Sequence, residues 1–321
     1  MAHWYAFNGD ADGLCALQQL RLGAPHSRRD PLVTGVKRDI ELLQRVPATA
    51  GDSVTVLDIS LDANRARLDA MLARNVSITW YDHHQAGEIP SDPRLSAHID
   101  FASDVCTSAL VDRHLGGAHR RWAATAAFGD SMPGLGRNLS TSAGLSDGDT
   151  DAIERLGVAL NYNAYGECIA DLHFDPALLA AEMLPFADPL EFIADSPSFA
   201  KLWSGYQADM AQARSLKPYR SKPGALVTLL PDTAWARRAI GVLANDLMHA
   251  HAECAIAILS PRSAGGYTAS VRVPALATIG ASDFCRQFPT GGGRRGAAGV
   301  NVLPAEEIDA FVARFEASFA R

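Results

Sequence analysis

In the first third of the chain, short apolar segments end in acidic residues, and amphipathic segments separate them. The apolar segments 3–7, 53–59 and 76–81 contain or lead into Asp10, Asp58 and Asp82. Strand patterns that alternate with helical patterns predict βαβ units and a parallel sheet. Parallel sheets keep their chemistry just beyond the carboxyl ends of the strands. We therefore expect a doubly wound α/β sheet with these acidic residues along one edge.

The remainder of the chain predicts a second, smaller α+β unit. A chain of 321 residues is too long for one ordinary core. The expected helices cover 14–22, 63–74, 198–215, 236–249 and 306–319, and the later strands cover 225–230, 255–259 and 267–273. Lysine, proline and glycine at 217–224 indicate a linker. The expected domains are 1–195, a connecting helix and linker at 196–224, and 225–321.

Charge and composition narrow the class of protein. The formal net charge of −7 disfavours a surface that holds long duplex nucleic acid, although divalent ions and local arginines can reverse the field in one cleft. No apolar run approaches about 18 residues, the length of a membrane span, and the N-terminus does not resemble a signal peptide. The five cysteines show no CxxC spacing, so we expect neither a zinc knuckle nor a disulfide framework, and a reducing, cytoplasmic location.

Two carboxylates separated by one residue stand in the turn Asp10-Ala11-Asp12-Gly13. Each can bind a different ion of a close pair, and Gly9 and Gly13 permit the tight turn. The alternative is an acidic loop in which Asp12 caps the following helix. Asp58 ends an apolar strand, where a carboxylate is costly unless it is paired or bound to a cation. The alternative there is a strand that ends early and leaves Asp58 in solvent.

Two adjacent histidines, His83 and His84, follow Asp82 directly after the third strand. Histidine is a frequent ligand of transition metals. Neighbouring side chains at a strand end point differently, so one histidine can bind a metal while the other reaches a substrate. A solvated turn is the alternative. Asp130 follows the apolar segment 122–127, which predicts a helix, and would add a fourth carboxylate to the site. The alternative is a helix that ends at Gly129 and leaves Asp130 in solvent.

In this order, these residues resemble the motifs of the DHH phosphoesterase superfamily. Asp10-Ala11-Asp12-Gly13 is similar to the first motif, Leu57-Asp58-Ile59-Ser60 to the second, Asp82-His83-His84-Gln85 to the third and Gly129-Asp130 to the fourth. The family also has a segment that opens a helix between the third and fourth motifs, and Ile99-Asp100 with Cys106-Thr107-Ser108 resembles it. Ser270-Val271-Arg272 and the run 291–299 resemble the associated DHHA1 domain, so the resemblance spans nearly the whole chain.

The resemblance implies two divalent ions, usually Mn²⁺ with Mg²⁺ or Co²⁺ as alternatives, and a shared water or hydroxide. One ion would bind Asp10, the other would bind Asp12, His83 and Asp130, and Asp58 would bridge them. His84 would contact the phosphate and help protonate it, with Asp82 supporting it from outside the ligand set. Many members carry a histidine at the position of Ala6, and the exonuclease branch often carries an aspartate at that of Asn8. We therefore expect the ion on Asp10 to bind more weakly than its neighbour.

Arginines and glycines of the second unit are candidates for substrate binding. A glycine run lets backbone N–H groups approach a phosphate, and arginine binds phosphate bidentately. The candidates are Arg272, Gly291, Gly292, Gly293, Arg294 and Arg295, with Lys37-Arg38 as a further phosphate candidate. A flexible connector with solvated arginines is the alternative for the glycine-rich run.

The resemblance implies hydrolysis of a short phosphodiester, such as a nano-oligonucleotide, a linear dinucleotide or a nucleotide 3′-phosphate. The alternatives are a single-strand exonuclease, a cyclic-dinucleotide phosphodiesterase, a phosphoanhydride hydrolase and a phosphate-binding regulatory protein without turnover. A processive exonuclease needs a long basic groove with stacking aromatics, which the charge of −7 and the aromatic content of 7% do not favour. The expected partner is a short oligonucleotide or small phosphorylated molecule, and a homodimer is left open.

Overall fold

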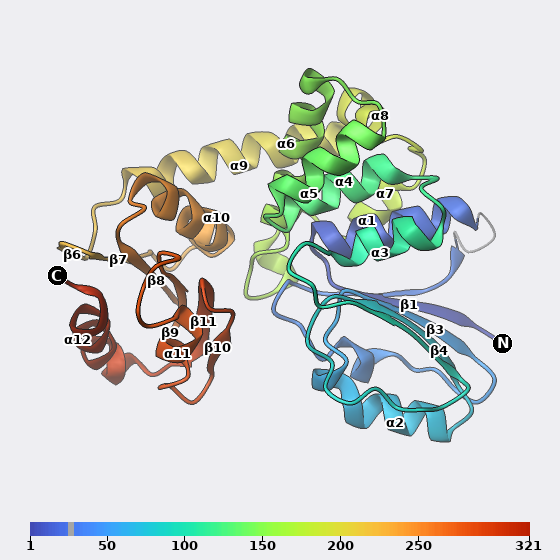
Figure 1. The fold of residues 1–321 in the computed structure, drawn as a ribbon, viewed down its shortest axis with the longest axis horizontal. Helices are drawn as coiled ribbons and strands as arrows, with labels where there is room; N and C mark the ends of the chain where they lie inside the picture. Colours follow the sequence, from blue (N-terminus) through green and yellow to red (C-terminus); the bar gives the residue numbers. More distant parts are fainter. Residues whose placement is uncertain (25–28) are drawn as a thin grey trace. The chain divides into compact units, whose positions relative to one another are not determined.

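A computed structural model describes residues 1–24 and 29–321 of the chain. The chain divides into two units, Met1–Gly205 and Tyr206–Arg321. The division falls inside the long helix α9 (Pro197–Ser215), which begins one residue earlier than predicted (Figure 1). Among the described helices, none is long and apolar enough to cross a membrane.

Unit 1 is built on a five-stranded sheet in which every pair of neighbours is parallel. The strands are β1 (His3–Phe7), β2 (Leu32–Val33), β3 (Ser53–Leu57), β4 (Ser77–Asp82) and β5 (Leu95–Ile99), in the order β2-β1-β3-β4-β5. The predicted parallel α/β sheet is confirmed. The short edge strands β2 and β5 were not predicted, because β2 is only two residues long and β5 has no buried residue.

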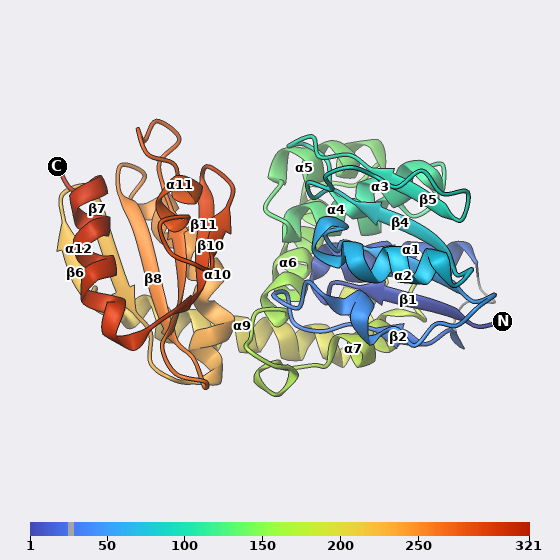
Figure 2. The ribbon, with the colours of Figure 1, turned by 90° about the horizontal axis from the view of Figure 1, so that it is seen from below.

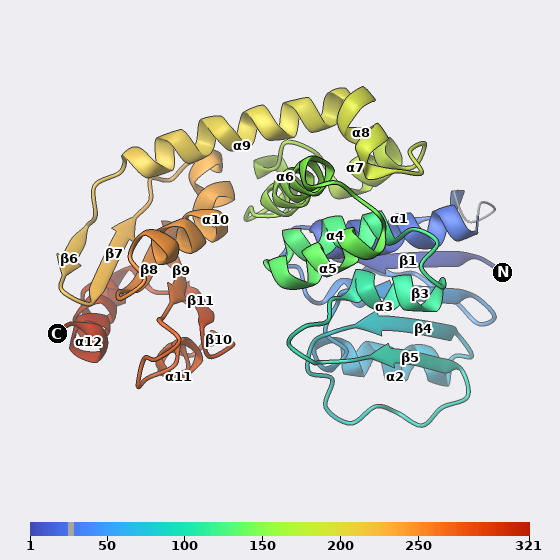
Figure 3. The same ribbon diagram turned by 45° about the horizontal axis from the view of Figure 1, so that its top comes forward.

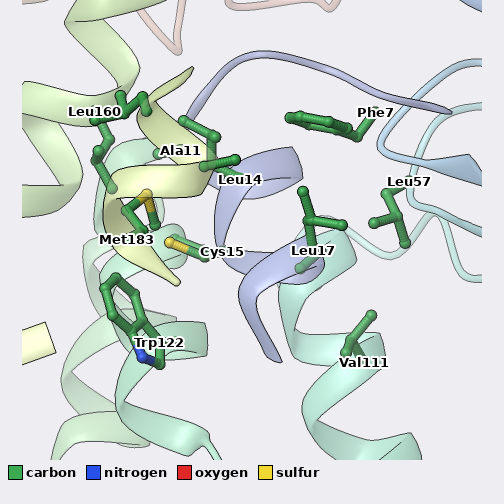
Figure 4. Packing of buried hydrophobic residues seen from close by; sticks show 14 of the residues in the cluster. Phe7, Ala11, Leu14, Cys15, Leu17, Leu57, Val111, Trp122, Leu160 and Met183 are labelled. Atoms are coloured by element: carbon green, nitrogen blue, oxygen red, sulfur yellow. The ribbon is translucent and has the colours of Figure 1, made fainter. Parts of the chain in front are cut away.

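Alternating side chains give the sheet two apolar faces. Phe7, Leu57 and Tyr81 belong to a buried cluster with α1 (Ala11–Gly23), α3 (Thr107–His114) and α4 (Arg120–Gly129). Figure 4 shows Phe7 and Leu57 beside side chains of α1 in this cluster. Ala6, Val56 and Trp80 point to the other face, which α2 (Arg65–Ala73) covers (Figures 2 and 3). Helices on both faces make the sheet doubly wound, as predicted.

The strand order reverses between β1 and β3. The chain passes from β1 through α1 to β2 on one side and then returns to place β3 on the other side of β1. In an open α/β sheet, the crevice beyond the carboxyl ends of two such strands is the usual ligand site. The residues that follow β1 and β3 include Asp10 and Asp58.

Helices fill the rest of unit 1. They are α5 (Pro133–Ser142), α6 (Asp147–Asn163), α7 (Pro176–Met183) and α8 (Pro189–Asp195). The prolines open α7 and α8, and the preceding Asp175 and Asp188 accept hydrogen bonds from backbone N–H groups of the first turn. Asp62 does not cap α2, whose N-cap is Asn64. Asp62 begins a short 3₁₀ helix (Asp62–Asn64) ahead of α2 and contacts Arg65.

Unit 2 is a six-stranded mixed sheet in the order β10-β11-β9-β8-β7-β6. The strands are β6 (Arg220–Lys222), β7 (Ala225–Leu229), β8 (Ala255–Pro261), β9 (Tyr267–Arg272), β10 (Gly291–Gly293) and β11 (Ala297–Leu303). Phenylalanines of α11 (Ala281–Cys285) and α12 (Ile308–Phe319) fill the core on one face, and α10 (Ala234–Ala250) packs on β8 and β9.

Two segments of unit 2 differ from the expectation. The predicted linker 217–224 contains β6, which pairs with β7 in antiparallel register. The glycine run, for which a flexible connector was the alternative, contains an edge strand, Gly291–Gly293, paired with β11. Both strands are three residues long, so the alternation that identifies a strand is too short to read. All five cysteines carry free thiols.

Candidate metal centre

The acidic clusters meet at the carboxyl edge of the unit 1 sheet. Asp10 and Asp12 follow β1, Asp58 follows β3, His83 follows β4 and Asp130 follows α4. Among the described residues, two groups could hold a metal ion, and in each the ligand atoms lie within 4.8 Å of one another: Asp12, His83 and Asp130, and Asp58, His83 and His84. His83 belongs to both groups, so β3, β4 and α4 deliver their side chains to one place.

Asp58 is the first residue beyond β3 and is only 2% exposed, so the alternative of a solvated strand end does not hold. Its φ of 57° lies in the left-handed region, which aspartate tolerates better than most residues. Its N–H still donates to the Tyr81 carbonyl at 3.0 Å, and its Oδ1 accepts from Thr107 Oγ1 at 3.1 Å. A strained, buried carboxylate at a strand end is typical of a functional position.

His83 is oriented as a metal ligand. Its Nδ1 lies 2.9 Å from the Val105 carbonyl, so this nitrogen donates, and Nε2 carries the lone pair in the neutral ring. Nε2 faces Asp58 Oδ1 at 3.4 Å and Asp130 Oδ2 at 3.7 Å. Burial lowers the pKa of His83, but the hydrogen bond and charge of Asp58, with Asp12 and Asp130, outweigh burial and raise it to about 10. These carboxylates therefore favour positive charge at the His83 ring, carried either by a proton or by a metal ion at Nε2.

Asp12 is held at the N-terminus of α3. Its Oδ2 accepts from the N–H of Thr107 and its Oδ1 from the N–H of Ser108, both at 2.7 Å. Helix N-termini stabilise negative charge, which keeps this carboxylate in a fixed position. Burial and the charges of Asp130 and Asp10 nevertheless raise the pKa of Asp12. The segment Cys106-Thr107-Ser108 thus opens α3, as the resemblance implied, and orients Asp12.

Asp130 reaches the centre because a glycine allows close packing of helices. α4 ends at Gly129, and a Cβ there would lie 2.3 Å from the Cβ of Ala11 and 2.7 Å from the Gly157 carbonyl. Only glycine permits this approach of α4 to α1 and α6. Asp130 follows directly, and its buried Oδ2 has no hydrogen-bond partner among the described residues. Such an orphaned oxygen beside His83 Nε2 is suited to bind a cation.

Asp10 has a different environment. It is the N-cap of α1, and its Oδ1 accepts from the N–H groups of Asp12 (3.0 Å) and Gly13 (3.1 Å), so Asp10 rather than Asp12 caps this helix. Its Oδ2 accepts from Lys37 Nζ. Lys37 lowers the pKa of Asp10 against the opposing effect of burial, and Asp10 raises that of Lys37. Asp10 belongs to neither metal-binding group.

The glycines of this turn are needed for close packing of the backbone rather than for a positive φ. Gly9 and Gly13 were expected to permit a tight turn, but neither has a positive φ. A Cβ on Gly9 would lie 2.2 Å from the Gly35 carbonyl, and one on Gly13 would lie 2.1 Å from the Asn8 carbonyl. Close backbone approach is therefore the reason for glycine at both positions.

Asp82 and His84 form a hydrogen-bonded pair beside the centre. Asp82 is fully buried, and its Oδ1 accepts from the N–H of His83 at 2.9 Å and lies 2.7 Å from His84 Nδ1. His84 is more exposed, with 39% of its side chain accessible, and its Nδ1 lies 4.0 Å from Asp58 Oδ1. Burial lowers the pKa of His84, but Asp82 and Asp58 outweigh this and raise it. Because Nδ1 is the ring nitrogen that contacts Asp82, Nε2 points away from Asp82.

The residues of the two groups supply donor atoms that suit a divalent ion. Carboxylate oxygens and an imidazole nitrogen on Asp12, Asp58, His83 and Asp130 suit Mn²⁺ and related ions. Burial and the charges of Asp10 and Asp12 raise the pKa of Asp58 well above its usual range, which a cation would reverse. The set that the resemblance implied for the other ion does not fit. Asp10 Oδ2 is paired with the Lys37 ammonium group, whose positive charge competes with a metal ion, and Ala6 lies in the apolar cluster on the α2 face.

The substrate candidates of unit 2 lie on β9, β10 and the turn after β10. Arg272 donates from Nε to Asn245 Oδ1 at 3.0 Å and from Nη1 to Ser270 Oγ at 3.1 Å. Arg294 and Arg295 are exposed, and Arg295 Nη2 donates to the Ala277 carbonyl at 2.8 Å. The side chain of Arg294 makes no hydrogen bond or ion pair with the described residues.

Three contacts of the centre were not predicted. Lys37 was considered only as a phosphate candidate, Asn161 was not considered, and Thr107 was not expected to contact Asp58. Lys37 Nζ lies 3.1 Å from Asn161 Oδ1 and 3.7 Å from Asp130 Oδ1. Asn161 lies on α6, more than a hundred residues from Lys37 in the sequence, and no local pattern links them.

A scan against protein-family models gives no match, and neither does a search of the curated proteins. Solved structures do match. A crystal structure of exonuclease RecJ bound to manganese is 20% identical, with 98% of this chain and 89% of that chain covered and a TM-score of 0.67. A DHH-domain structure, described as a member of a family of ribosomal proteins, is 13% identical. The match covers 98% of this chain and 86% of that chain, with a TM-score of 0.66.

A third structure is the pGpG-specific phosphodiesterase PggH from Vibrio cholerae. It is 13% identical, with 99% of this chain and 100% of that chain covered and a TM-score of 0.56. Matches that extend over nearly the whole chain show a shared fold in both units. The chain therefore has the fold of the DHH phosphoesterase superfamily, an α/β unit followed by a mixed-sheet unit.

Proposed function

We propose that this chain, which has the DHH phosphoesterase fold, is a metal-dependent hydrolase of short phosphodiesters. The observation that carries the proposal is the convergence of Asp12, Asp58, His83 and Asp130 at the edge where the strand order reverses. The fold alone does not give activity, because one fold hosts many functions. The argument for hydrolysis therefore rests on these side chains and on His84 beside them.

The residues Asp12, Asp58, His83 and Asp130 would hold the ion. Mn²⁺ is our first choice because it accepts carboxylate and imidazole together, with Mg²⁺ and Co²⁺ as alternatives. A divalent ion supplies a Lewis acid for phosphoryl oxygens and makes water a better nucleophile at neutral pH. The role of Asp58 as a bridge between two ions stays a prediction.

His84 is the residue we assign to the substrate. Hydrolysis forms a bond between a water oxygen and phosphorus and breaks an ester P–O bond, and the departing oxygen then takes up a proton. Since Nδ1 of His84 is held by Asp82, Nε2 is the nitrogen available to donate to a phosphate oxygen or to the leaving oxygen. The part-exposed side chain is open to a ligand, and buried Asp82 fixes its orientation.

A short substrate fits the charge of the chain. The net charge of −7 is unfavourable for a long polyanion, whereas a few arginines can bind one or two phosphates. Arg272, Arg294, Arg295 and the backbone of Gly291–Gly293 are our candidates for that role. PggH is named for pGpG and RecJ as an exonuclease, so both a dinucleotide and a longer single strand belong in the assay.

The substrate assay compares four classes of phosphorus compound in the presence of Mn²⁺. These are a linear dinucleotide, a longer single strand, a cyclic dinucleotide and pyrophosphate. We expect the highest kcat/KM for the dinucleotide. A preference for the long strand would select the exonuclease alternative. Absence of hydrolysis of all four, with phosphate ligands still bound, would select a binding protein and contradict the proposal.

Variants test the assignment of the centre. Asp12→Asn and His83→Ala each remove a metal ligand, and we expect both to lower kcat/KM by more than the roughly 100-fold that loss of an outer partner can cost. Asp69→Asn on α2 is the matched control, since Asp69 is exposed and lies on the helix that covers the other face of the sheet from α1, α3 and α4. An active Asp12→Asn protein would remove Asp12 from the ligand set.

The arginines are tested separately, because they lie in unit 2. Changing Arg294 and Arg295 together to alanine is expected to raise KM more than it lowers kcat, since they would bind the part of the substrate that does not react. Both side chains are exposed, so the fold is expected to be unaffected. An unchanged KM would remove them from the substrate site.

A further inference from the structure

Lys37 occupies a defined position beside Asp10. It follows β2, which neighbours β1 in the sheet, so the turn after β2 reaches the same carboxyl edge as Asp10. The Lys37 N–H donates to the Ala164 carbonyl at 2.9 Å, just past the end of α6. Its Nζ donates to Asn161 Oδ1 at 3.1 Å and also donates to Asp10 Oδ2. The backbone and the ammonium group are thus both held.

The ammonium group lies where the implied first ion would need its ligands. Asp10 Oδ2 contacts Nζ, and Asp130 Oδ1 lies 3.7 Å from it. The other oxygen of Asp10 is engaged by two N–H groups of the α1 N-terminus. A divalent ion on Asp10 would therefore share the Asp10 carboxylate with the ammonium group of Lys37. The two positive charges would lie a few ångströms apart and would repel each other at any protein dielectric.

Ala6 supplies no ligand to this ion, although the buried Oδ1 of Asn8 has no hydrogen-bond partner among the described residues. At Ala6, the position where a histidine would be expected, the chain packs into an apolar cluster with Val56 and Trp80. The two groups of convergent ligand atoms in the described chain both exclude Asp10. The four residues of the fitting donor set, in contrast, have an orphaned Asp130 oxygen and a correctly oriented His83.

We propose that Lys37 takes the place of the first divalent ion, so that the centre binds one ion and the lysine supplies the second positive charge. The inference rests on the proposed function, since it assumes an ion on Asp12, Asp58, His83 and Asp130. A fixed ammonium group can neutralise Asp10 and attract a phosphate without exchanging with the solvent. It cannot bring a second metal-activated water, so Asp58 has only one ion to bind.

The test counts bound Mn²⁺ by native mass spectrometry at saturating metal and records the EPR spectrum of the same samples. An isolated Mn²⁺ ion and an exchange-coupled pair have different spectra, so the readout does not depend on turnover. We expect one ion and an isolated-ion spectrum for the wild type. Asp10→Asn should still bind one ion, because asparagine is an equally good N-cap and preserves the helix start. Asp12→Asn should bind none.

Lys37→Met removes the charge but keeps an unbranched side chain of similar length. We expect this variant to bind two ions and to give the spectrum of a coupled pair, because Asp10 Oδ2 is then free. Lys222→Met is the matched control, since Lys222 forms an ion pair with Glu316 in unit 2. It should bind one ion like the wild type.

The outcomes separate this inference from the proposed function. Two ions in the wild type, with one lost in Asp10→Asn, would overturn the role of Lys37 and leave a metal-dependent hydrolase. One ion in both the wild type and Lys37→Met would also overturn it, because Lys37 would then not be what excludes the second ion. No bound ion in the wild type would overturn the metal centre and the inference together.

Discussion

At the scale of single residues, Asp58 combines an unusual backbone conformation with a buried charge. A left-handed conformation costs most residues about 1–2 kcal/mol, and aspartate and asparagine tolerate it best. Burial and two neighbouring carboxylates also disfavour the ionised form of Asp58. The fold therefore keeps this residue at an energetic cost, which is what we expect where the side chain has a chemical role.

This conformation decides which Asp58 variant is informative. Alanine at φ 57° would add strain of about 1 kcal/mol that asparagine avoids, so Asp58→Asn is more informative than Asp58→Ala. We expect Asp58→Asn to lose activity while the metal-free protein is at least as stable as the metal-free wild type at pH 7, because a like charge has been removed. Urea unfolding with a parallel Mn²⁺-dependent assay measures both. Substantial remaining activity would contradict the assignment of Asp58.

The sign of this effect follows from the direction of the pKa shift. The folded pKa of Asp58 lies well above 3.8, its usual value, so the folded state binds this proton more tightly than the unfolded chain. Stability from this group is therefore fully present below the unfolded value and is lost as pH rises from there through the folded pKa. Asparagine does not titrate, so the stability difference between wild type and variant is expected to shrink at acidic pH.

At the scale of elements, strand β10 carries two kinds of glycine. It lies at the edge of its sheet and pairs only with β11. A Cβ on Gly291 would lie 1.7 Å from the Cys285 carbonyl, and Gly293 has a φ of 141°. A Cβ on Gly292 would meet nothing within 4 Å. Two glycines of the run therefore have structural reasons to be glycine, and Gly292 has none in unit 2 itself.

Because of this difference, variants of Gly291 and Gly292 distinguish a role of β10 in folding from a role in substrate binding. We expect Gly291→Ala to lower the free energy of unfolding by about 1–3 kcal/mol, since the backbone must shift. Gly292→Ala should unfold like the wild type. If the β10 backbone approaches a phosphate, Gly292→Ala should raise KM for the dinucleotide at unchanged stability. Steady-state kinetics beside urea unfolding measures this, and a normal KM would mean that β10 does not bind the substrate.

At the scale of the whole molecule, each unit has a hydrophobic core of its own. Unit 1 buries apolar clusters on both faces of its sheet, and unit 2 packs Phe284, Phe311 and Phe315 on one face of its sheet. Every residue of the proposed ion site lies in unit 1. Binding of the ion should therefore stabilise unit 1 directly.

Hydrogen exchange followed by mass spectrometry tests this localisation. At a Mn²⁺ concentration of about 100 times Kd, binding contributes about 2.7 kcal/mol to the state that binds. We expect slower exchange in peptides that contain the ends of β1, β3 and β4 and the start of α3, with peptides of α11 and α12 as the internal reference. Protection confined to unit 2 would place the ion elsewhere.

The amino-acid sequence alone predicted the parallel sheet, the second unit and the residues that meet at the strand ends. It could do so because these depend on local patterns. Apolar strands, intervening helices and an acidic residue directly after each strand are visible within short windows, and parallel strands necessarily bring their carboxyl ends together. The position of Asp130 after a helix was also visible, because the apolar segment before it ends in glycine.

Only the tertiary structure decided what each carboxylate contacts. The choice between Asp10 and Asp12 as the cap of α1 depends on hydrogen bonds from α3, which begins about 95 residues later. The contacts of Lys37 with Asp10 and Asn161 join β1, the turn after β2 and α6, which packing alone brings together. A motif specifies which ligands are present, but the charges that compete for them come from distant segments. For this reason the resemblance implied two ions, and the contacts of Lys37 lead us to propose one.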